Sequence, residues 1–126
     1  MIIIDTDVLI EISDRHSEKG DQIYQKIMST GEDIAITSIT LYETLYGLMK
    51  SKKPFYYLSL FNVYEFSKED AHQAAKLDLE LEKKGKRIKR TDITIASSTT
   101  INKGATLCTF DQEFSELEER GLRLLR

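Results

Sequence analysis

Short apolar runs alternate along this chain with stretches of helical spacing, and this pattern predicts alternating strands and helices. The runs at 2–4, 33–37 and 105–108 show no in–out alternation, which is typical of strands buried on both faces of a parallel sheet. Further strands are expected at 62–66 and 122–125. Helices are expected between the strands, at residues 17–30, 39–50, 68–84, 92–102 and 112–119. This order predicts an α/β fold with a central parallel sheet flanked by helices.

Hydroxyl and acidic residues mark the expected helix starts. Ser67 is followed by Asp70, an arrangement typical of a capping box at the start of the helix over 68–84. The helix over 39–50 has as candidate caps Thr37, Ser38 and Thr40. Its apolar residues lie almost all round the expected helix, so we expect it to be mostly buried.

The composition is that of a globular protein, and residues 1–126 are expected to form a single domain. The net charge of −3 means that any contact with nucleic acid must come from a local basic patch. Cys108 is the sole cysteine, which excludes a disulfide framework and a cysteine-ligated zinc site. The sequence contains neither a membrane-length apolar run nor the features of a signal peptide, so a cytoplasmic location without membrane contact is expected.

Four acidic residues lie where a predicted strand ends or where the next helix begins, namely Asp5, Glu43, Asp92 and Asp111. Each has a structural explanation. Asp5 suits a turn at a strand end, and Glu43 could form a capping box with Thr40. Asp92 in the first turn of a helix would favour the helix dipole, and Asp111 is a plausible N-cap.

Taken together, the four acids favour a site rather than four separate caps. In a parallel sheet the positions that follow the strands share one edge, where α/β proteins bind ligands. Glu43 and Asp92 are set among apolar or small neighbours, where an unpaired carboxylate would be costly. Neighbouring carboxylates must take up protons unless a cation neutralises them, and oxygen ligands suit Mg²⁺ or Mn²⁺.

Four blocks that contain these acids resemble, in order and spacing, those of PIN domains and especially of VapC-type toxins of prokaryotic toxin–antitoxin pairs. The blocks are IIDTDVLI at 3–10, SITLYETLYG at 38–47, KGKRI followed by DITIAS within 84–97, and LCTFDQEF at 107–114. The resemblance covers essentially the whole chain. It implies a three-layer, PIN-like fold and a metal-dependent endoribonuclease that leaves a 5′-phosphate and a 3′-hydroxyl.

The resemblance also implies roles for single residues and partners for the chain. It implies that Mg²⁺ or Mn²⁺ is held by Asp5, Glu43, Asp92 and Asp111, that the chain forms a homodimer, and that a small VapB-type antitoxin covers the active site. Asp7 stands where relatives often have Asn or Ser, and we interpret it as a helix cap, with support of the metal ligands as the alternative. The hydroxyl of Thr109 is expected to orient a carboxylate or a water.

A basic segment leads directly to Asp92 and contains the candidate substrate-binding residues Lys86, Arg87, Lys89 and Arg90. Arg90 departs from the small or acidic residue that relatives often carry there. The segment would contact RNA phosphates, or it is a solvated helix end, because lysines favour helix C-termini.

Two other functions are compatible with parts of this pattern. One is a catalytically silent PIN-like module that binds RNA or protein, although the presence of all four acids favours an enzyme. The other is an α/β phosphatase or phosphotransferase with Asp5 as the nucleophile, for which the required lysine and hydroxyl residues are not identified in the sequence.

Overall fold

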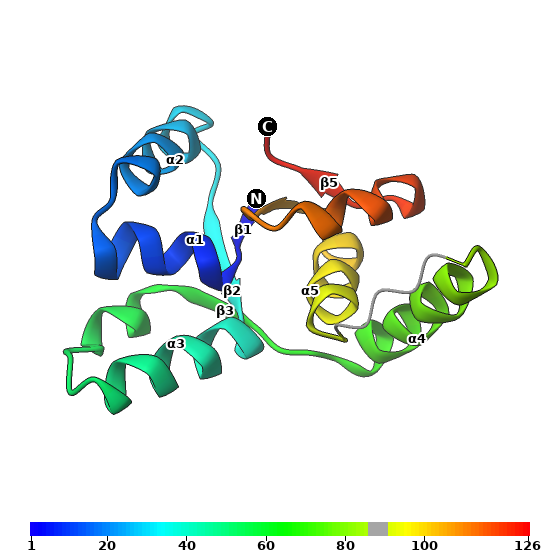
Figure 1. The fold of residues 1–126 in the computed structure, drawn as a ribbon, viewed down its shortest axis with the longest axis horizontal. Coiled ribbons are helices and arrows are strands. Elements are labelled where there is room, and N and C mark those ends of the chain that lie inside the picture. Colours follow the sequence, from blue (N-terminus) through cyan, green and yellow to red (C-terminus); the bar gives the residue numbers. More distant parts are fainter. Residues whose placement is uncertain (86–90) are drawn as a thin grey trace.

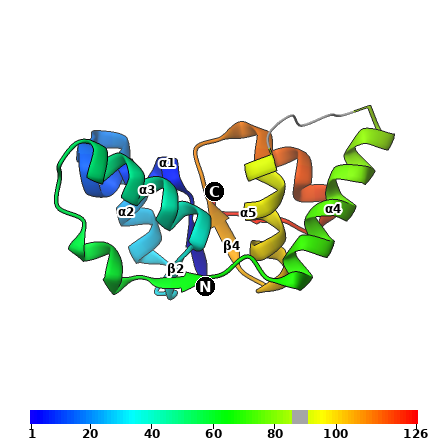
Figure 2. The ribbon, with the colours of Figure 1, turned by 90° about the horizontal axis from the view of Figure 1, so that it is seen from below.

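A five-stranded parallel sheet with the order β3-β2-β1-β4-β5 runs through the centre of the molecule in the computed structural model, which describes residues 1–85 and 91–126 (Figure 1). The strands are β1 (Ile2–Ile4), β2 (Ile34–Thr37), β3 (Asn62–Tyr64), β4 (Thr106–Cys108) and β5 (Arg123–Leu124). Helices cover both faces of this sheet (Figures 1 and 2). The predicted three-layer α/β fold with a parallel sheet is therefore confirmed.

The pleat of β1 divides its three isoleucines between two apolar clusters. Ile2 and Ile4 pack on one face of the sheet and Ile3 on the other, and all three are buried. The helical segments that pack on the first face are α1 (Thr6–Ile10), the π-helical turn η1 (Glu11–Arg15), α2 (Glu18–Ser29), α3 (Ser38–Lys50) and the 3₁₀ segment η2 (Tyr56–Leu60). Those on the second face are α4 (Lys68–Lys83), α5 (Thr91–Asn102) and the 3₁₀ segment η3 (Gln112–Arg120).

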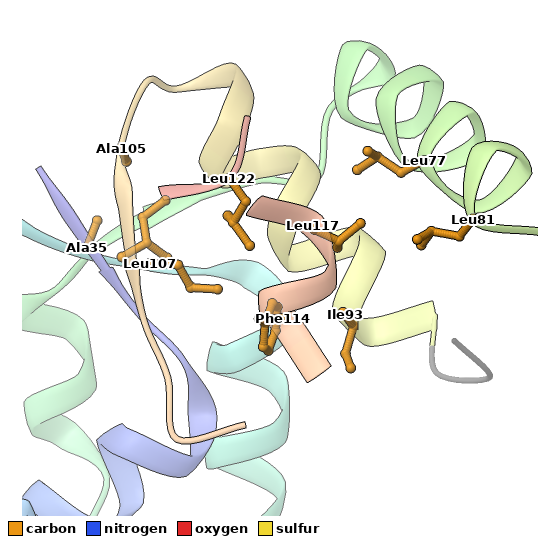
Figure 3. Close-up of a cluster of buried hydrophobic side chains, with 10 residues drawn as sticks. Ala35, Leu77, Leu81, Ile93, Ala105, Leu107, Phe114, Leu117 and Leu122 are labelled. Atoms are coloured by element: carbon orange, nitrogen blue, oxygen red, sulfur yellow. The ribbon is translucent and has the colours of Figure 1, made fainter. Parts of the chain in front are cut away.

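The cluster on the second face joins the sheet to elements that are distant in sequence. Ile3 pairs with Ala35 on one side and with Leu107 on the other, and these neighbours share its face. Phe114 of η3 and Leu77 of α4 pack into the same cluster (Figure 3). The apolar run 2–4 therefore forms the central strand because it can bury side chains on both faces.

The predicted helix caps are largely confirmed. Ser67 and Asp70 form a reciprocal capping box at the start of α4. Thr37 is the N-cap of α3, and its hydroxyl accepts a hydrogen bond from the Thr40 backbone N–H at 3.2 Å. Within the ranges 1–85 and 91–126, no helix is long and apolar enough to cross a membrane.

The expectation that the helix over 39–50 is mostly buried is wrong. The side chains of Tyr42, Tyr46 and Met49 are 67 %, 58 % and 53 % exposed. Because one face of α3 packs against α1 and β2, only Thr40, Thr44 and Leu48 become buried. Residues 1–85 and 91–126 leave the remaining apolar face of α3 uncovered.

Gly20 lies in the first turns of α2, where the backbone passes directly over η1. A Cβ at this position would stand 2.3 Å from the carbonyl oxygen of Glu11, which is too close for any side chain. We therefore expect Gly20→Ala to lower the free energy of unfolding by about 1–3 kcal/mol, as overpacking does elsewhere. Gly47, within α3, is the matched control because a Cβ there would contact nothing within 4 Å.

Gly47→Ala should raise the free energy of unfolding by about 0.5–1 kcal/mol, since alanine loses less entropy in a helix. Urea unfolding of both variants measures the difference. Equal effects of the two substitutions would show that the close approach of α2 to η1 is not a constraint.

Candidate active site

The carboxyl ends of β1, β2 and β4 meet at one edge of the sheet. Asp5 follows β1 directly, α3 follows β2, and Thr109 follows β4. β1 lies between β2 and β4, so the strands that follow it in sequence are added first on one side of β1 and then on the other. Such a reversal of strand order is where open α/β sheets form ligand-binding crevices.

A cleft of about 350 Å³ opens at this edge of the sheet. Its lining residues are Asp5, Thr6, Asp7, Ile10, Glu43, Asp92 and Asp111. The structure thus brings all four acids singled out in the sequence into one cleft, and it adds Asp7 to them. Their assignment as catalytic and metal-binding residues stays a prediction.

Asp5 is a carboxylate in a partly desolvated, acidic setting. Its Oδ2 atom accepts a hydrogen bond from the Thr109 hydroxyl at 2.8 Å, as expected for a hydroxyl that orients a carboxylate. Burial, with the neighbouring charges of Asp7 and Glu43 adding to it, raises the pKa of Asp5 to about 6, against the effect of the Thr109 hydrogen bond. The site therefore disfavours the ionised form of Asp5, chiefly because its carboxylate is buried.

Asp7 is not the helix cap that we expected. The N-cap of α1 is Asp5, whose side chain makes no capping hydrogen bond. The Asp7 carboxylate instead accepts hydrogen bonds from the backbone N–H of Val8 at 2.8 Å and of Phe110 at 3.1 Å. It ties α1 to the loop after β4, and burial raises its pKa.

Glu43 reaches the cleft from the second turn of α3. The hydroxyl of Thr6 donates a hydrogen bond to its Oε1 atom at 2.8 Å. The capping box with Thr40 does not form, because α3 begins one turn earlier, at the N-cap Thr37. Glu43 is also exposed, and not enclosed by apolar neighbours as the sequence suggested. Its side chain is held in the cleft by the hydrogen bond from Thr6.

Asp92 and Asp111 both lie at the start of a helix, as expected if they act as a first-turn acid and an N-cap. Asp92 lies in the first turn of α5. Asp111 is the N-cap of η3, where its Oδ1 atom accepts a hydrogen bond from the Glu113 backbone N–H at 3.0 Å. Since both residues also line the cleft, a capping role and a role in the site are compatible for these two acids.

Sequence reasoning missed Thr6 and Ile10 as residues of the cleft. The hydroxyl of Thr6 donates to Glu43, which is 37 residues away along the chain. Ile10 lies one turn after Thr6 on α1 and is an apolar residue in the lining of the cleft. The helical spacing of 6 and 10 places both side chains on the same face and would have indicated this arrangement.

The donor set fits a hard divalent cation. Five of the cleft's seven lining residues carry carboxylates, whose oxygens Mg²⁺ and Mn²⁺ prefer. A bound cation would also offset the burial and the neighbouring negative charges that raise the pKa of Asp5. Within the part of the chain that the structure describes, no three acidic, histidine or cysteine side chains are placed to enclose one ion by themselves. This agrees with the usual mode of Mg²⁺, which is held through one or two carboxylates and keeps several waters.

The predicted substrate-binding residues Lys86, Arg87, Lys89 and Arg90 lie outside the described residues. Of the basic residues just before them, Lys84 is exposed and its Nζ atom lies 3.3 Å from Glu119 Oε2. His16 and His72 are exposed and do not line the cleft. Cys108 is buried within β4, and burial raises its pKa to about 12, which makes it an inert core residue.

The model of the PIN-domain family matches residues 2–120 of this chain. The chain belongs to the PIN-domain family.

Within this family the chain is similar to Ribonuclease VapC2 of Rickettsia felis, with 33 % identity over an alignment of 116 residues. The match covers 85 % of this chain and 84 % of that protein. In the crystal structure of VapBC2 from Rickettsia felis bound to a DNA fragment from their promoter, one chain has 29 % identity and a TM-score of 0.78, with 98 % of this chain and 97 % of that chain covered. FitAcB of Neisseria gonorrhoeae, at 19 % identity, has a TM-score of 0.77 over 100 % of this chain and 97 % of that chain, and it supports the fold alone.

These comparisons confirm the predicted membership of the PIN-domain family and the resemblance to VapC proteins. They also support the predicted enzyme class, a hydrolase of the nuclease type.

Proposed function

We propose that this chain is a Mg²⁺- or Mn²⁺-dependent endoribonuclease and the toxin of a VapBC-type toxin–antitoxin pair, acting as one domain in the cytoplasm, where its RNA substrate is found. The observation that carries the proposal is the gathering of five carboxylates in one cleft at the carboxyl edge of the sheet. Membership of the PIN-domain family and similarity to a protein named as a ribonuclease support it.

Asp5 and Asp92 are our first choice as direct ligands, with Glu43 as a further ligand or as the group that positions the attacking water. Asp111 would complete the site of a second ion. A bound divalent ion supplies a water of lowered pKa and neutralises charge that develops on the phosphate. Thr109 fixes the orientation of Asp5 through its 2.8 Å hydrogen bond, and Thr6 does the same for Glu43. These hydroxyls preorganise the carboxylates before the substrate arrives.

We also propose a homodimer and a VapB-type antitoxin as protein partners. Support comes from the apolar surface that α3 and η2 leave exposed. It includes Tyr42, Tyr46 and Met49, and beside them a groove of about 380 Å³ that is lined mostly by apolar residues, among them Leu45 and Tyr56. Exposed apolar surface of this extent is typical of protein interfaces. The basic residues at 86, 87, 89 and 90 are proposed to contact the RNA backbone.

Cleavage of RNA should require an added divalent ion. Purified protein treated with EDTA should leave RNA intact, and Mg²⁺ or Mn²⁺ should restore cleavage, because the acids of the cleft have no catalytic histidine beside them among the residues that the structure describes. The measurement is the appearance of fragments from a defined single-stranded RNA, with an Asp5→Asn variant purified in parallel to exclude a contaminating nuclease.

Full cleavage in excess EDTA would contradict metal dependence. A parent protein that binds RNA yet never cuts it in Mg²⁺ or Mn²⁺ would instead identify the chain as a silent binding module. A phosphatase with Asp5 as nucleophile would form an acyl-phosphate on this residue, which mass spectrometry of the quenched reaction would detect.

A further inference from the structure

Lys19, on the first turn of α2, lies against the loop that carries Asp111 of the acidic cleft. Its Nζ atom lies 4.9 Å from the centroid of the Phe110 ring. Phe110 in turn donates its backbone N–H to Asp7 and immediately precedes Asp111, and both of these acids line the cleft. The positive charge of Lys19 is close enough to act on the Asp7 carboxylate. The fold therefore holds an ammonium group beside the carboxylates, although α2 supplies none of the lining residues.

Lys19 shares its ion-pair partner, Glu11, with a second cation. Its Nζ atom is 3.9 Å from Glu11 Oε1, whereas Arg15 Nη1 approaches the same oxygen to 3.1 Å and forms the closer ion pair. The side chain of Lys19 is 61 % exposed. An ammonium group has three donors, and contacts with one ring face and one shared carboxylate leave it able to bind a further anion.

We propose that Lys19 binds a backbone phosphate of the RNA next to the scissile one and so positions the strand in the cleft, an inference that rests on the proposed function. The carboxylates of the cleft repel the anionic backbone wherever no metal ion neutralises them. A cation at this position offsets this repulsion for the flanking phosphate. The Phe110 ring holds the ammonium in place through its face, so Lys19 is a positioning residue and not a catalytic one.

Lys103 provides a matched control for this assignment. Its Nζ atom also lies 4.9 Å from the centroid of an aromatic ring, that of Tyr64. Lys103 is exposed, and neither it nor Tyr64 lines the cleft. Replacing Lys103 by glutamine removes the same charge and the same kind of ring contact, but at a site away from the acids.

The experiment compares Lys19→Gln, Lys19→Arg and Lys103→Gln with the parent in steady-state cleavage of a single-stranded oligoribonucleotide in Mg²⁺, at a series of KCl concentrations. Lys19→Gln should raise KM by about three- to tenfold with kcat little changed, as for the loss of a contact made equally in ground and transition state. The slope of log(kcat/KM) against log[KCl] should become shallower by about 0.7, the value for one phosphate contact on a single strand. Lys19→Arg should retain the parental KM, and Lys103→Gln should match the parent in both quantities.

Thermal melts distinguish this result from a structural role. An increase in KM that appeared only together with a lower melting temperature would overturn the proposal. An unchanged KM and salt slope in Lys19→Gln, with a parent that cleaves RNA, would overturn it and leave the proposed function standing. Equal effects of Lys19→Gln and Lys103→Gln would also overturn it, because the effect would then reflect overall charge. A parent that neither binds nor cleaves RNA would contradict the proposed function itself.

Discussion

Asp92→Asn should abolish RNA cleavage while leaving the metal-free protein at least as stable as the parent. Residues that merely orient metal ligands typically contribute about 10–100-fold, so loss of a direct ligand should lower kcat/KM by more than about 100-fold. Asparagine removes one repelling charge from the cleft, and the helix-dipole stabilisation lost from the first turn of α5 is only about 0.3–1 kcal/mol. The stabilisation by Mg²⁺, which arises because the ion binds the folded state alone, should shrink.

The measurement is a cleavage assay beside thermal melts with and without Mg²⁺. Asp21→Asn is the matched control, because Asp21 also lies in the first turn of a helix, α2, but is exposed and does not line the cleft. Asp21→Asn should lose a similar helix-dipole stabilisation and should keep the parental cleavage activity. Parental cleavage and a parental Mg²⁺ shift in Asp92→Asn would remove Asp92 from the site and with it most of the support for the mechanism.

Asp70→Ala should lower the free energy of unfolding at neutral pH by about 3–5 kcal/mol, because several hydrogen bonds converge on this carboxylate. Asp70 is 2 % exposed and accepts bonds from Thr99 Oγ1 and Asn102 Nδ2, both at 2.8 Å, and from the Ser67 backbone N–H at 3.2 Å. Alanine would leave the buried Thr99 hydroxyl without this acceptor and would remove the capping box of α4. Urea unfolding at neutral pH measures the loss.

The contribution of Asp70 should also depend on pH in a defined direction. Burial acts to raise its pKa, but the hydrogen bonds from Asn102, Ser67 and Thr99 outweigh burial and hold the pKa below its ordinary value of 3.8. A lowered pKa in the folded state stabilises the protein above the unfolded value, and this stabilisation is lost as pH falls through the folded value. The difference between parent and Asp70→Ala should therefore be full above about pH 5 and shrink at lower pH.

Asp78, two turns further along α4, is the matched control for Asp70. Its carboxylate accepts a longer bond from Thr94 at 3.5 Å, and burial, with the charge of Glu82 adding to it, raises its pKa. Its ionised form is not stabilised by the fold, so Asp78→Ala should change the free energy of unfolding by about 1 kcal/mol or less. Similar losses in both variants would show that any acid on this face of α4 serves equally well.

Local patterns in the sequence predicted most elements and the edge at which the acids gather. The unalternated run at 2–4 can bury apolar side chains only between two covered faces, so it identified the central strand. The acids at the ends of strands and the starts of helices then had to share an edge, because parallel strands all end on the same side. For the helix over 39–50 the prediction of a helix was correct, but the prediction that it is mostly buried was wrong. The sequence shows which residues are apolar, but it does not show whether this chain or another molecule covers them.

The sequence by itself determined those features that depend on residues near one another along the chain. They include the strand and helix order, the capping box of Ser67 and Asp70, and the placement of Asp5, Glu43, Asp92 and Asp111 at one edge. Periodicity and capping depend on residues within one or two helical turns, so they can be recognised in the sequence without knowledge of the fold.

Only the tertiary structure decided which distant groups satisfy each carboxylate. Asp7 binds the backbone N–H of Phe110 at a separation of 103 residues, and Thr109 donates to Asp5 at a separation of 104. Lys19 likewise meets the Phe110 ring through folding alone. These contacts arise because β4 is inserted beside β1, and no local propensity specifies which strand becomes the neighbour of another.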